Sequence, residues 1–272
     1  MTPVLAVNHL SVTLQSGKNT KQLVKDSSFS VYPGECLGIL GESGSGKSMT
    51  VKSMLGLLDR HFSATGEAFF CGKDLLKEKK ETLRSLRGKD ITMVLQNPMT
   101  CFDPLYRIGN QMAETFATHT NWSQKKIREE SLAILDRMQI QNPKEALEKY
   151  PHQLSGGMLQ RIMIGLAVAL KPKLLIADEP TTAIDAITQK EILEAFLEIK
   201  NAHQTAMIFI THDLGAIAKV ADRLLVMNQG EIVDEGTFSH ILHHAQDRYT
   251  KLLIEKRQAV MARYQQVLGG MV

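Results

Sequence analysis

A glycine-rich loop near the N-terminus constrains the fold of this chain more than any other feature. The loop follows a short apolar run at 36–40 and precedes an apolar-patterned segment that ends near Leu58; it consists of Gly41, Glu42, Ser43, Gly44, Ser45, Gly46, Lys47 and Ser48. A strand, a glycine loop and a helix in this order form the context in which the spacing G-x-x-x-x-G-K-S predicts a P-loop. The glycines let backbone N–H groups turn inward toward an anion, and the helix N-terminus adds positive potential. The sequence therefore predicts a site for a nucleoside triphosphate.

Three residues at the end of this loop have separate expected roles. Lys47 supplies a point charge for the β and γ phosphates, and we count it among the catalytic candidates. Ser48 offers a hydroxyl group to Mg²⁺, and Met49 follows it in the phosphate-binding segment. The predicted ligands are therefore a nucleoside triphosphate and Mg²⁺.

Composition limits the class of protein. A length of 272 residues suits one large α/β core with an inserted lobe or two small domains. The net charge of +3 comes from both signs mixed along the chain, so nothing requires a nucleic-acid partner. Cys36, Cys71 and Cys101 form no CxxC pair and indicate reduced residues of a cytosolic protein. We expect no signal peptide and no membrane-spanning helix, although the chain can lie against a membrane.

Strand patterns lie at both ends of the chain and helical patterns lie in its middle. Alternating strands and helices predict a mostly parallel sheet, and the middle segment predicts a helical lobe inserted between two halves of that sheet. We expect a nucleotide-binding domain at 1–240 with a helical subdomain at 98–170, and a C-terminal helical extension at 241–272. The expected strands are 4–14, 28–32, 36–40, 66–70, 91–95, 174–177, 206–210, 224–227 and 231–233.

Polar side chains follow three of the predicted strands. Asp178 and Glu179 end a buried apolar run, where Asp178 can reach the Mg²⁺ shell and Glu179 can polarise the attacking water. Gln96 ends the strand at 91–95, and its amide can contact both Mg²⁺ and that water. His212 follows the strand at 206–210 and can hydrogen-bond the γ-phosphate from the same edge. The assignments of Gln96 and His212 depend on their expected closeness to Asp178 and Glu179.

A second glycine-containing helix start lies more than a hundred residues from the first. Ser155, Gly156 and Gly157 precede a helix that is apolar on most faces, which predicts a second anion site in the helical lobe. One nucleotide needs only one P-loop. A second phosphate site therefore suggests that two copies face each other and that each closes over the other's ATP.

Together these elements resemble the nucleotide-binding subunit of ATP-binding-cassette (ABC) transporters. The resemblance covers residues from about 4 to 240 and implies a RecA-like P-loop NTPase core, mostly parallel, with a small antiparallel β subdomain and an inserted α-helical subdomain. It also implies hydrolysis of ATP to ADP and phosphate, with Ser48, Gln96 and Asp178 holding Mg²⁺, in part through water. The matching motifs, in family order, are Walker A (Gly41–Ser48), the Q-loop (Gln96), the signature (Leu154–Met158), Walker B (Leu174–Glu179), the D-loop (Thr182–Asp185) and the H-loop (His212).

A narrower resemblance is to the oligopeptide, dipeptide and nickel importer group. Met158 stands where most cassettes carry Gln, and the segment 157–161 is most similar to nickel-import and opine-metallophore-import ATPases. Peptide members often carry a C-terminal cysteine cluster, but no cysteine follows Cys101, so we expect no iron–sulfur cluster and favour the metal branch. The other segments that carry this resemblance are 96–100, 150–158, 177–182 and Tyr249-Thr250.

Adenine recognition departs from the family pattern. The family usually places an aromatic residue in the first strand–loop region, where it stacks on the base. No Phe, Tyr or Trp lies between Val4 and Lys25, and Tyr32 is the nearest polar aromatic residue. We therefore expect weak selectivity among bases.

The resemblance implies an ATPase subunit of a binding-protein-dependent importer for nickel or another transition metal, free or bound to an opine-type metallophore. An importer of dipeptides or oligopeptides is the alternative within the importer group. An exporter subunit is an alternative outside that group. The segment from Gln96 to Thr100 is expected to transmit the state of the γ-phosphate to the helical lobe. One or two methionines near Met99 are candidates for lining a groove that receives a permease helix.

A soluble ABC ATPase that acts on ribosomes or DNA is the alternative from a different class. Such proteins usually carry two cassettes or long coiled coils, whereas this chain has one cassette and a short lobe. A P-loop kinase leaves Ser155-Gly156-Gly157 unexplained. The expected partners are a second ATPase subunit (identical or different), two permease subunits and, through them, an external substrate-binding protein, with no nucleic acid. The expected location is the cytoplasmic face of a bacterial cell membrane, as a peripheral protein.

Overall fold

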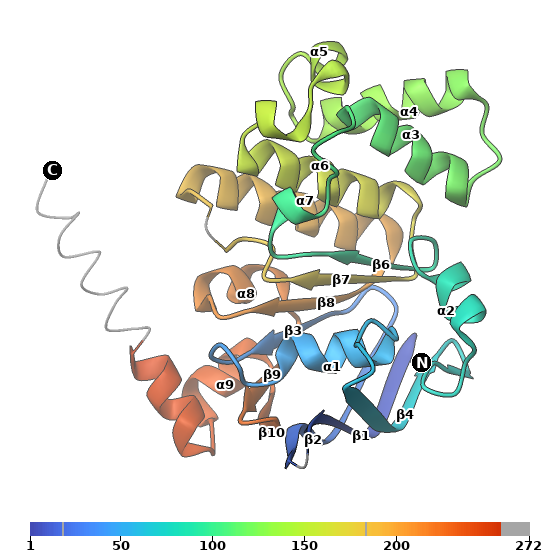
Figure 1. Cartoon of the computed structure of the whole chain (residues 1–272). Coiled ribbons are helices and arrows are strands. Elements are labelled where there is room, and N and C mark those ends of the chain that lie inside the picture. Colours follow the sequence, from blue (N-terminus) through green and yellow to red (C-terminus); the bar gives the residue numbers. More distant parts are fainter. Residues whose placement is uncertain (18, 183, 257–272) are drawn as a thin grey trace, which may run out of the picture.

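The computed structural model describes residues 1–17, 19–182 and 184–256 and builds two sheets at an angle to each other (Figure 1). The larger sheet has six strands in the order β10-β9-β3-β8-β7-β6, and all neighbours are parallel except β10 and β9. Its strands are β3 (Cys36–Leu40), β6 (Ile91–Val94), β7 (Leu174–Asp178), β8 (Ala206–Thr211), β9 (Arg223–Asn228) and β10 (Glu231–Gly236).

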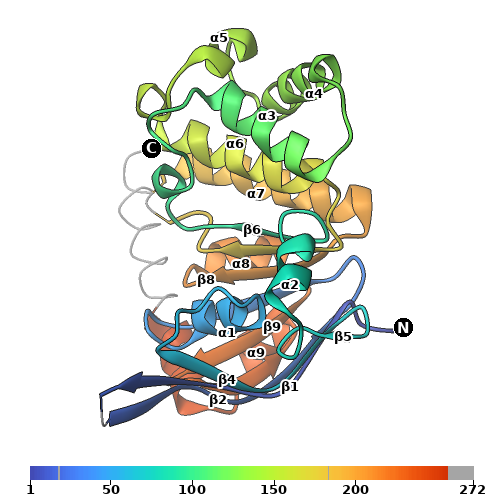
Figure 2. The ribbon, with the colours of Figure 1, turned by 45° about the vertical axis from the view of Figure 1, so that its right-hand side comes forward.

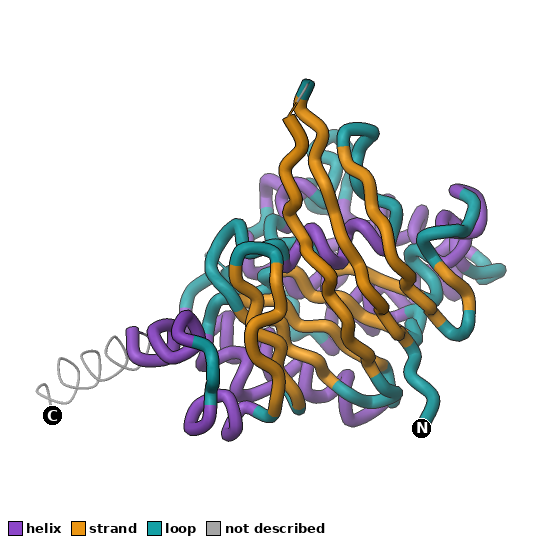
Figure 3. The backbone as a smooth tube through the Cα atoms, turned by 90° about the horizontal axis from the view of Figure 1, so that it is seen from below, coloured by secondary structure: helices purple, strands orange, loops and turns teal. Residues whose placement is uncertain are grey.

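The smaller sheet is antiparallel, with the order β2-β1-β4-β5. Its long strands lie side by side in the view from below (Figure 3). The hairpin of β1 and β2 extends past the rest of the molecule (Figure 2). The strands are β1 (Leu5–Ser16), β2 (Asn19–Val31), β4 (Phe62–Phe70) and β5 (Lys73–Asp74).

Helices cover the larger sheet and form a layer at one end of the molecule. Four of them, α3 to α6, lie together above β6 and β7, on the side away from the antiparallel sheet (Figure 1). The helices are α1 (Lys47–Met54), α2 (Lys80–Leu86), α3 (Ile108–His119), α4 (Gln124–Arg137), α5 (Pro143–Glu148), α6 (Gly156–Ala169), α7 (Ala186–His203), α8 (Leu214–Val220) and α9 (Phe238–His244). Two 3₁₀ turns, η1 (Pro98–Thr100) and η2 (Pro151–Gln153), connect them.

The central strands are buried because their sequences are continuous apolar runs, as a parallel sheet covered on both faces requires. Every residue of β3, β7 and β8 is buried. On one face, Leu175 and Phe209 share a core with Phe116 of α3 and Leu159 of α6. On the other face, Ile39 and Ile176 pack with Val51 of α1 and with the antiparallel sheet. The helix α1 is thus held between the two sheets.

These observations confirm the predicted α/β fold, its mostly parallel core and its small antiparallel sheet. The start of β2 was predicted wrongly, at residue 28 instead of Asn19. The polar residues at 19–22 showed no strand pattern, yet they pair with β1 in a hairpin, where Leu14 faces Lys21. The pattern also did not indicate α2.

The proposed domain division remains a prediction. The helix α9 runs across the expected boundary at residue 240, and residues 248–256 form a further helical segment. Leu253 and Ile254 of that segment pack with Leu40 of β3. The part of the predicted extension at 257–272 lies outside the described residues. Within the described ranges, no helix has the length and apolar character needed to span a bilayer.

Candidate functional site

Four neighbouring strands of the larger sheet end at the same edge, and the predicted site residues follow those ends. β3 leads into the loop at 41–46, β6 into Gln96, β7 into Glu179 and β8 into His212. The parallel register aligns Leu40 with Thr211 and Asp178 with Ile210, so these segments start at similar heights. This is the edge at which ligands bind in open parallel sheets.

The glycine loop adopts a conformation that depends on its glycines. Gly44 and Gly46 have φ angles of +80° and +108°, which side chains rarely tolerate. A Cβ atom on Gly41 would lie 2.4 Å from the Met227 carbonyl oxygen. Gly46 precedes α1, and none of the described side chains caps this helix start. The first N–H groups of α1 are therefore free of side-chain competition for an anion.

Lys47 is buried at the centre of the site. Its Nζ donates hydrogen bonds to the carbonyl oxygens of Gly41 and Glu42, at 2.8 and 2.9 Å, and lies 3.9 Å from Glu179 Oε1. Burial lowers the pKa of Lys47, whereas the charges of Glu179 and Asp178 act to raise it. The ammonium group is thus held at one end of the loop, where a point charge meets phosphate oxygens.

Ser48 and Asp178 lie together below the loop. Ser48 Oγ donates a hydrogen bond to Asp178 Oδ1 at 2.6 Å, and Lys52 Nζ lies 4.0 Å from Oδ2. Burial raises the pKa of Asp178, against the hydrogen bond from Ser48. A hydroxyl and a carboxylate oxygen suit Mg²⁺, which keeps several waters and takes few protein ligands. No group of three or more His, Cys, Asp or Glu side chains in the described part of the chain forms a separate metal cage.

Glu179 is held in an unusual conformation at the end of β7. Its φ angle is +53°, in the left-handed region, which costs a non-glycine residue about 1–3 kcal/mol. Its N–H group donates to the Ile210 carbonyl oxygen at 2.9 Å. Its Oε2 atom accepts a hydrogen bond from Thr182 Oγ1 and lies 2.7 Å from His212 Nδ1. The neighbouring β8 segment thus maintains the strained backbone and the carboxylate orientation.

A cavity of about 580 Å³ joins these groups. Its lining includes the other predicted P-loop residues together with Gln96, Glu179 and His212, but not Gly41 or Asp178. Lys21 and Leu23 of β2 also line it, and the sequence did not indicate them because the start of β2 was misplaced. The lining residues are Lys21, Leu23, Glu42, Ser43, Gly44, Ser45, Gly46, Lys47, Ser48, Met49, Gln96, Glu179 and His212.

Tyr32, the nearest polar aromatic residue in the sequence, does not line this cavity. Tyr32 lies in the turn that precedes β3, and its N–H group donates to Glu35 Oε2 at 2.8 Å. The loop follows the opposite end of β3. The described residues that line the cavity include no Phe, Tyr or Trp.

The predicted signature residues begin α6, away from the lining of this cavity. Ser155 caps the helix by accepting a hydrogen bond from the Met158 N–H group at 3.2 Å, and Ser155 and Gly156 are exposed. A Cβ atom on Gly157 would lie 2.8 Å from the Thr188 side chain, so this helix start packs closely against α7. Of the predicted D-loop, Ala183 lies outside the described residues.

Two contacts at or next to Glu179, made by Thr182 and Gln160, were not predicted from the sequence. Thr182 donates to Glu179 Oε2 at 2.7 Å, as noted above. Gln160 is fully buried in α6 and donates from Nε2 to the Pro180 carbonyl oxygen at 2.9 Å. The signature helix is thus hydrogen-bonded to the residue that follows Glu179. Local patterns carry no signal for such a contact.

A sequence profile described as ABC transporter matches residues 24–182. The chain belongs to the ABC transporter family. It is 46% identical over 267 residues to the metal-staphylopine import system ATP-binding protein CntD of Staphylococcus aureus, and the alignment covers 98% of each chain. It is 43% identical to the dipeptide transport ATP-binding protein DppD of Bacillus subtilis, over 93% of this chain and 76% of the relative.

The solved structures agree on the fold of this ABC protein. A dimeric ATP-binding cassette in a post-hydrolysis state with ADP and phosphate matches with a TM-score of 0.78, covering 86% of this chain and 98% of the other. Its sequence identity is 23%, so this likeness shows the shared fold alone. The predicted family and its activity, ATP hydrolysis coupled to transport, are confirmed by the family match and the relatives.

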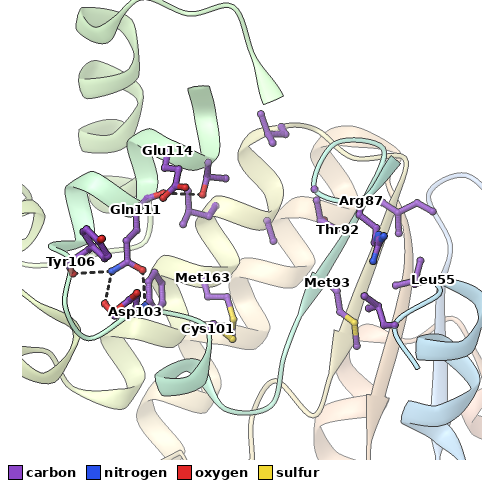
Figure 4. A pocket seen from close by; sticks show the side chains of 18 residues that line it. Leu55, Arg87, Thr92, Met93, Cys101, Asp103, Tyr106, Gln111, Glu114 and Met163 are labelled. Atoms are coloured by element: carbon purple, nitrogen blue, oxygen red, sulfur yellow. Dashed lines mark hydrogen bonds between the residues drawn. The ribbon is translucent and has the colours of Figure 1, made fainter. Parts of the chain in front are cut away.

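This ABC ATPase has a second cavity, of about 800 Å³, between the helical layer and the larger sheet. In Figure 4, Tyr106, Asp103 and Gln111 lie on one side of it, Leu55, Arg87 and Met93 lie on the other, and Met163 lies between them. We call this cavity the groove. Its other lining residues are Leu57, Gly88, Ile91, Thr92, Cys101, Phe102, Glu114, Thr115, Leu166, Ala167 and Leu170.

One part of the rim of the groove begins at Cys101, a short distance after Gln96. Asn97 caps the turn η1 through a hydrogen bond from the Met99 N–H group to its side chain. Gln111 then fixes the next segment, since its Oε1 accepts from the Asp103 N–H group and its Nε2 donates to the Asp103 and Tyr106 carbonyl oxygens. Three apolar side chains remain exposed beside this rim: Met99 at 47%, Leu105 at 78% and Tyr106 at 55%.

Proposed function

We propose that this ABC ATPase drives import of nickel or another transition metal, free or bound to an opine-type metallophore. The observation that carries this proposal is the end-to-end match to a metal-staphylopine import ATP-binding protein, which covers 98% of both chains. The described structure supports the ATPase half of the proposal through the cluster of Lys47, Glu179 and His212.

In this proposal the loop binds the phosphates of ATP. The backbone N–H groups of Gly44 to Met49 donate hydrogen bonds to the β and γ phosphates, and the Lys47 ammonium group adds a positive charge. Ser48, Asp178 and Gln96 hold Mg²⁺, which neutralises charge on the phosphates. The hydrogen bond between Ser48 and Asp178 supports this assignment, since it shows that both oxygens reach one point.

Glu179 is proposed to orient and polarise the attacking water. Thr182 and His212 both engage Oε2, so Oε1 is the oxygen that faces the loop and Lys47. A carboxylate held in this way can accept a proton as the water attacks in line with the leaving oxygen. Gln96 reaches the same space from β6, and His212 lies at the γ-phosphate edge.

Two cassettes are proposed to share each ATP. Ser155 and Gly156 are exposed at the helix start that Gly157 continues, which suits an anion presented by another chain. The second cassette is either a copy of this chain or a related subunit. ATP held between the two would draw them together, and hydrolysis would let them separate.

The groove is proposed to receive a helix of a permease. Apolar side chains exposed at its rim favour a protein partner. Residues 96–100 lead from the γ-phosphate edge to Cys101 at the rim, so movement at the γ-phosphate would reach the permease through this segment. Two permease subunits would connect the pair of cassettes to an external substrate-binding protein. In this proposal the chain lies at the cytoplasmic face of a bacterial membrane and has no nucleic-acid partner.

Import of dipeptides is the second candidate, because 43% identity to a dipeptide transport ATP-binding protein extends over 93% of this chain. Uptake measurements distinguish metal import from dipeptide import. They use cells that lack this chain and are complemented either with the wild type or with Glu179→Gln. We expect radioactive nickel, offered alone or with an opine chelator, to enter only with the wild type. Loss of labelled dipeptide uptake, with metal uptake intact, would assign the peptide function instead.

A further inference from the structure

Tyr249 contacts the P-loop from a distant part of the sequence. Its hydroxyl oxygen accepts a hydrogen bond from the Glu42 N–H group at 2.9 Å, across 207 positions of the chain. Tyr249 belongs to the helical segment 248–256, which the roles proposed above do not use. The contact therefore joins the C-terminal segment to the loop that binds phosphate.

The contact acts on one peptide group. The Glu42 N–H and the Gly41 C=O belong to the same planar trans peptide, so they point in opposite directions. The N–H is held by Tyr249, and the C=O accepts a hydrogen bond from Lys47 Nζ at 2.8 Å. Tyr249 and the ammonium group of Lys47 thus hold opposite edges of one plane. A rotation of that plane would break both contacts.

The segment that carries Tyr249 is itself anchored to the larger sheet. The Asp234 carboxylate of β10 accepts hydrogen bonds from the N–H groups of Gln246 and Asp247, each at 3.1 Å. Asp247 Oδ1 then accepts from the Tyr249 N–H group at 2.7 Å. Farther along, Leu253 and Ile254 are buried in a core with Leu40, the last residue of β3. The hydroxyl is therefore presented by a rigid support.

We propose that Tyr249 is a positioning residue for ATP binding, acting through the Gly41–Glu42 peptide on Lys47. By this route the C-terminal segment sets the affinity of the loop for nucleotide. The inference rests on the proposed role of Lys47 at the β and γ phosphates. It adds a control point that lies outside the P-loop and the signature.

The test compares Mg²⁺–ATP binding by the full chain and by Tyr249→Phe, which removes the hydroxyl and keeps the ring. Loss of one neutral hydrogen bond predicts a dissociation constant about three- to tenfold higher. In the assembled transporter, KM should rise by a similar factor, with kcat at saturating ATP within about twofold. Tyr32→Phe is the matched control, because Tyr32 lies beyond the other end of β3.

A dissociation constant for Tyr249→Phe within about 1.5-fold of the wild type would overturn the proposal, even if the melting temperature fell. A lower melting temperature with unchanged affinity would assign Tyr249 a purely structural role. If the wild type itself failed to bind ATP, the role of the P-loop would be at fault, so the two failures are distinguishable.

A second variant tests the route. Asp234→Ala should also weaken ATP binding, because it releases the turn that presents Tyr249. The variant with both Asp234→Ala and Tyr249→Phe should bind ATP with the same affinity as the single variant of lower affinity, since both changes break the same connection. Fully additive losses would contradict a route from Asp234 to Tyr249.

Discussion

The Glu179 carboxylate and the His212 imidazole are in direct contact, with Oε2 and Nδ1 2.7 Å apart. Thr182 donates to the same oxygen. One carboxylate oxygen is therefore occupied by neighbours from two loops, and the other faces Lys47 at 3.9 Å. Orientation of this carboxylate depends on β8 as well as β7.

Glu179→Gln should retain ATP binding and lose hydrolysis. The amide can keep contacts with Thr182 and His212, but it cannot accept a proton from water. We expect turnover at saturating ATP to fall by at least about 100-fold in the assembled complex, within the range of general-base effects. Binding should change less than about threefold. Glu145→Gln, on the exposed surface of α5, is the control, and near-normal hydrolysis by Glu179→Gln would refute the assignment.

Ser155→Arg should impair hydrolysis in the complex and leave ATP binding to the isolated chain almost unchanged. The reason is that Ser155 begins α6 and does not line the cavity of its own P-loop. Ser123→Arg is the matched control, since Ser123 caps α4 in the same way. Equal loss of binding in the isolated chain would show that Ser155 acts on its own subunit.

ATP and GTP should bind with affinities that differ by less than about tenfold. Stacking of a base on an aromatic ring contributes about 1–3 kcal/mol, and each 1.4 kcal/mol changes affinity about tenfold. The described lining offers Lys21 and Leu23 in place of an aromatic ring. Calorimetric titration with both nucleotides measures the ratio, and Tyr32→Ala should leave it unchanged. A hundredfold preference for ATP would mean that another group recognises adenine.

Asp178→Asn should stabilise the nucleotide-free chain at neutral pH. Burial raises the pKa of Asp178, so the folded state favours the protonated carboxyl group. The free energy of unfolding therefore falls as the pH rises from the unfolded-state pKa through the folded-state pKa. The variant should melt about 1–4 °C higher at pH 7. The difference should vanish below about pH 3, under the unfolded-state pKa of about 3.9, where the carboxyl group is protonated in both states. A lower melting temperature at pH 7 would contradict this sign.

Tyr106→Arg should prevent assembly with the permease and leave ATP binding intact. The side chain is 55% exposed and lines the groove, so a charge there alters the proposed docking surface without disturbing the core. Co-purification from membranes measures assembly. Tyr32→Arg is the matched control, because Tyr32 is also exposed and lies elsewhere. Normal assembly of Tyr106→Arg would place the permease contact outside the groove.

The parallel core was predictable because its strands are apolar runs that end in polar residues. The run at 174–178 shows this most directly, since burial of the strand and the position of Glu179 follow from the same pattern. The first part of β2, which carries Lys21, escaped prediction because residues 19–22 are all polar, and pairing with β1 overrides this local preference. The contact of Tyr249 with Glu42 depends on the packing of distant segments, and no local pattern carries it.

The separation of the groove from the nucleotide cavity has a pharmacological consequence. No lining residue is shared between the two described cavities, although only the short segment from Gln96 to Cys101 separates their rims. An inhibitor that fills the groove would therefore not occupy the proposed ATP site, and ATP would not displace it directly. It would also avoid the phosphate-binding loop that unrelated ATPases have in common, so selectivity would depend on side chains such as Tyr106 and Met163.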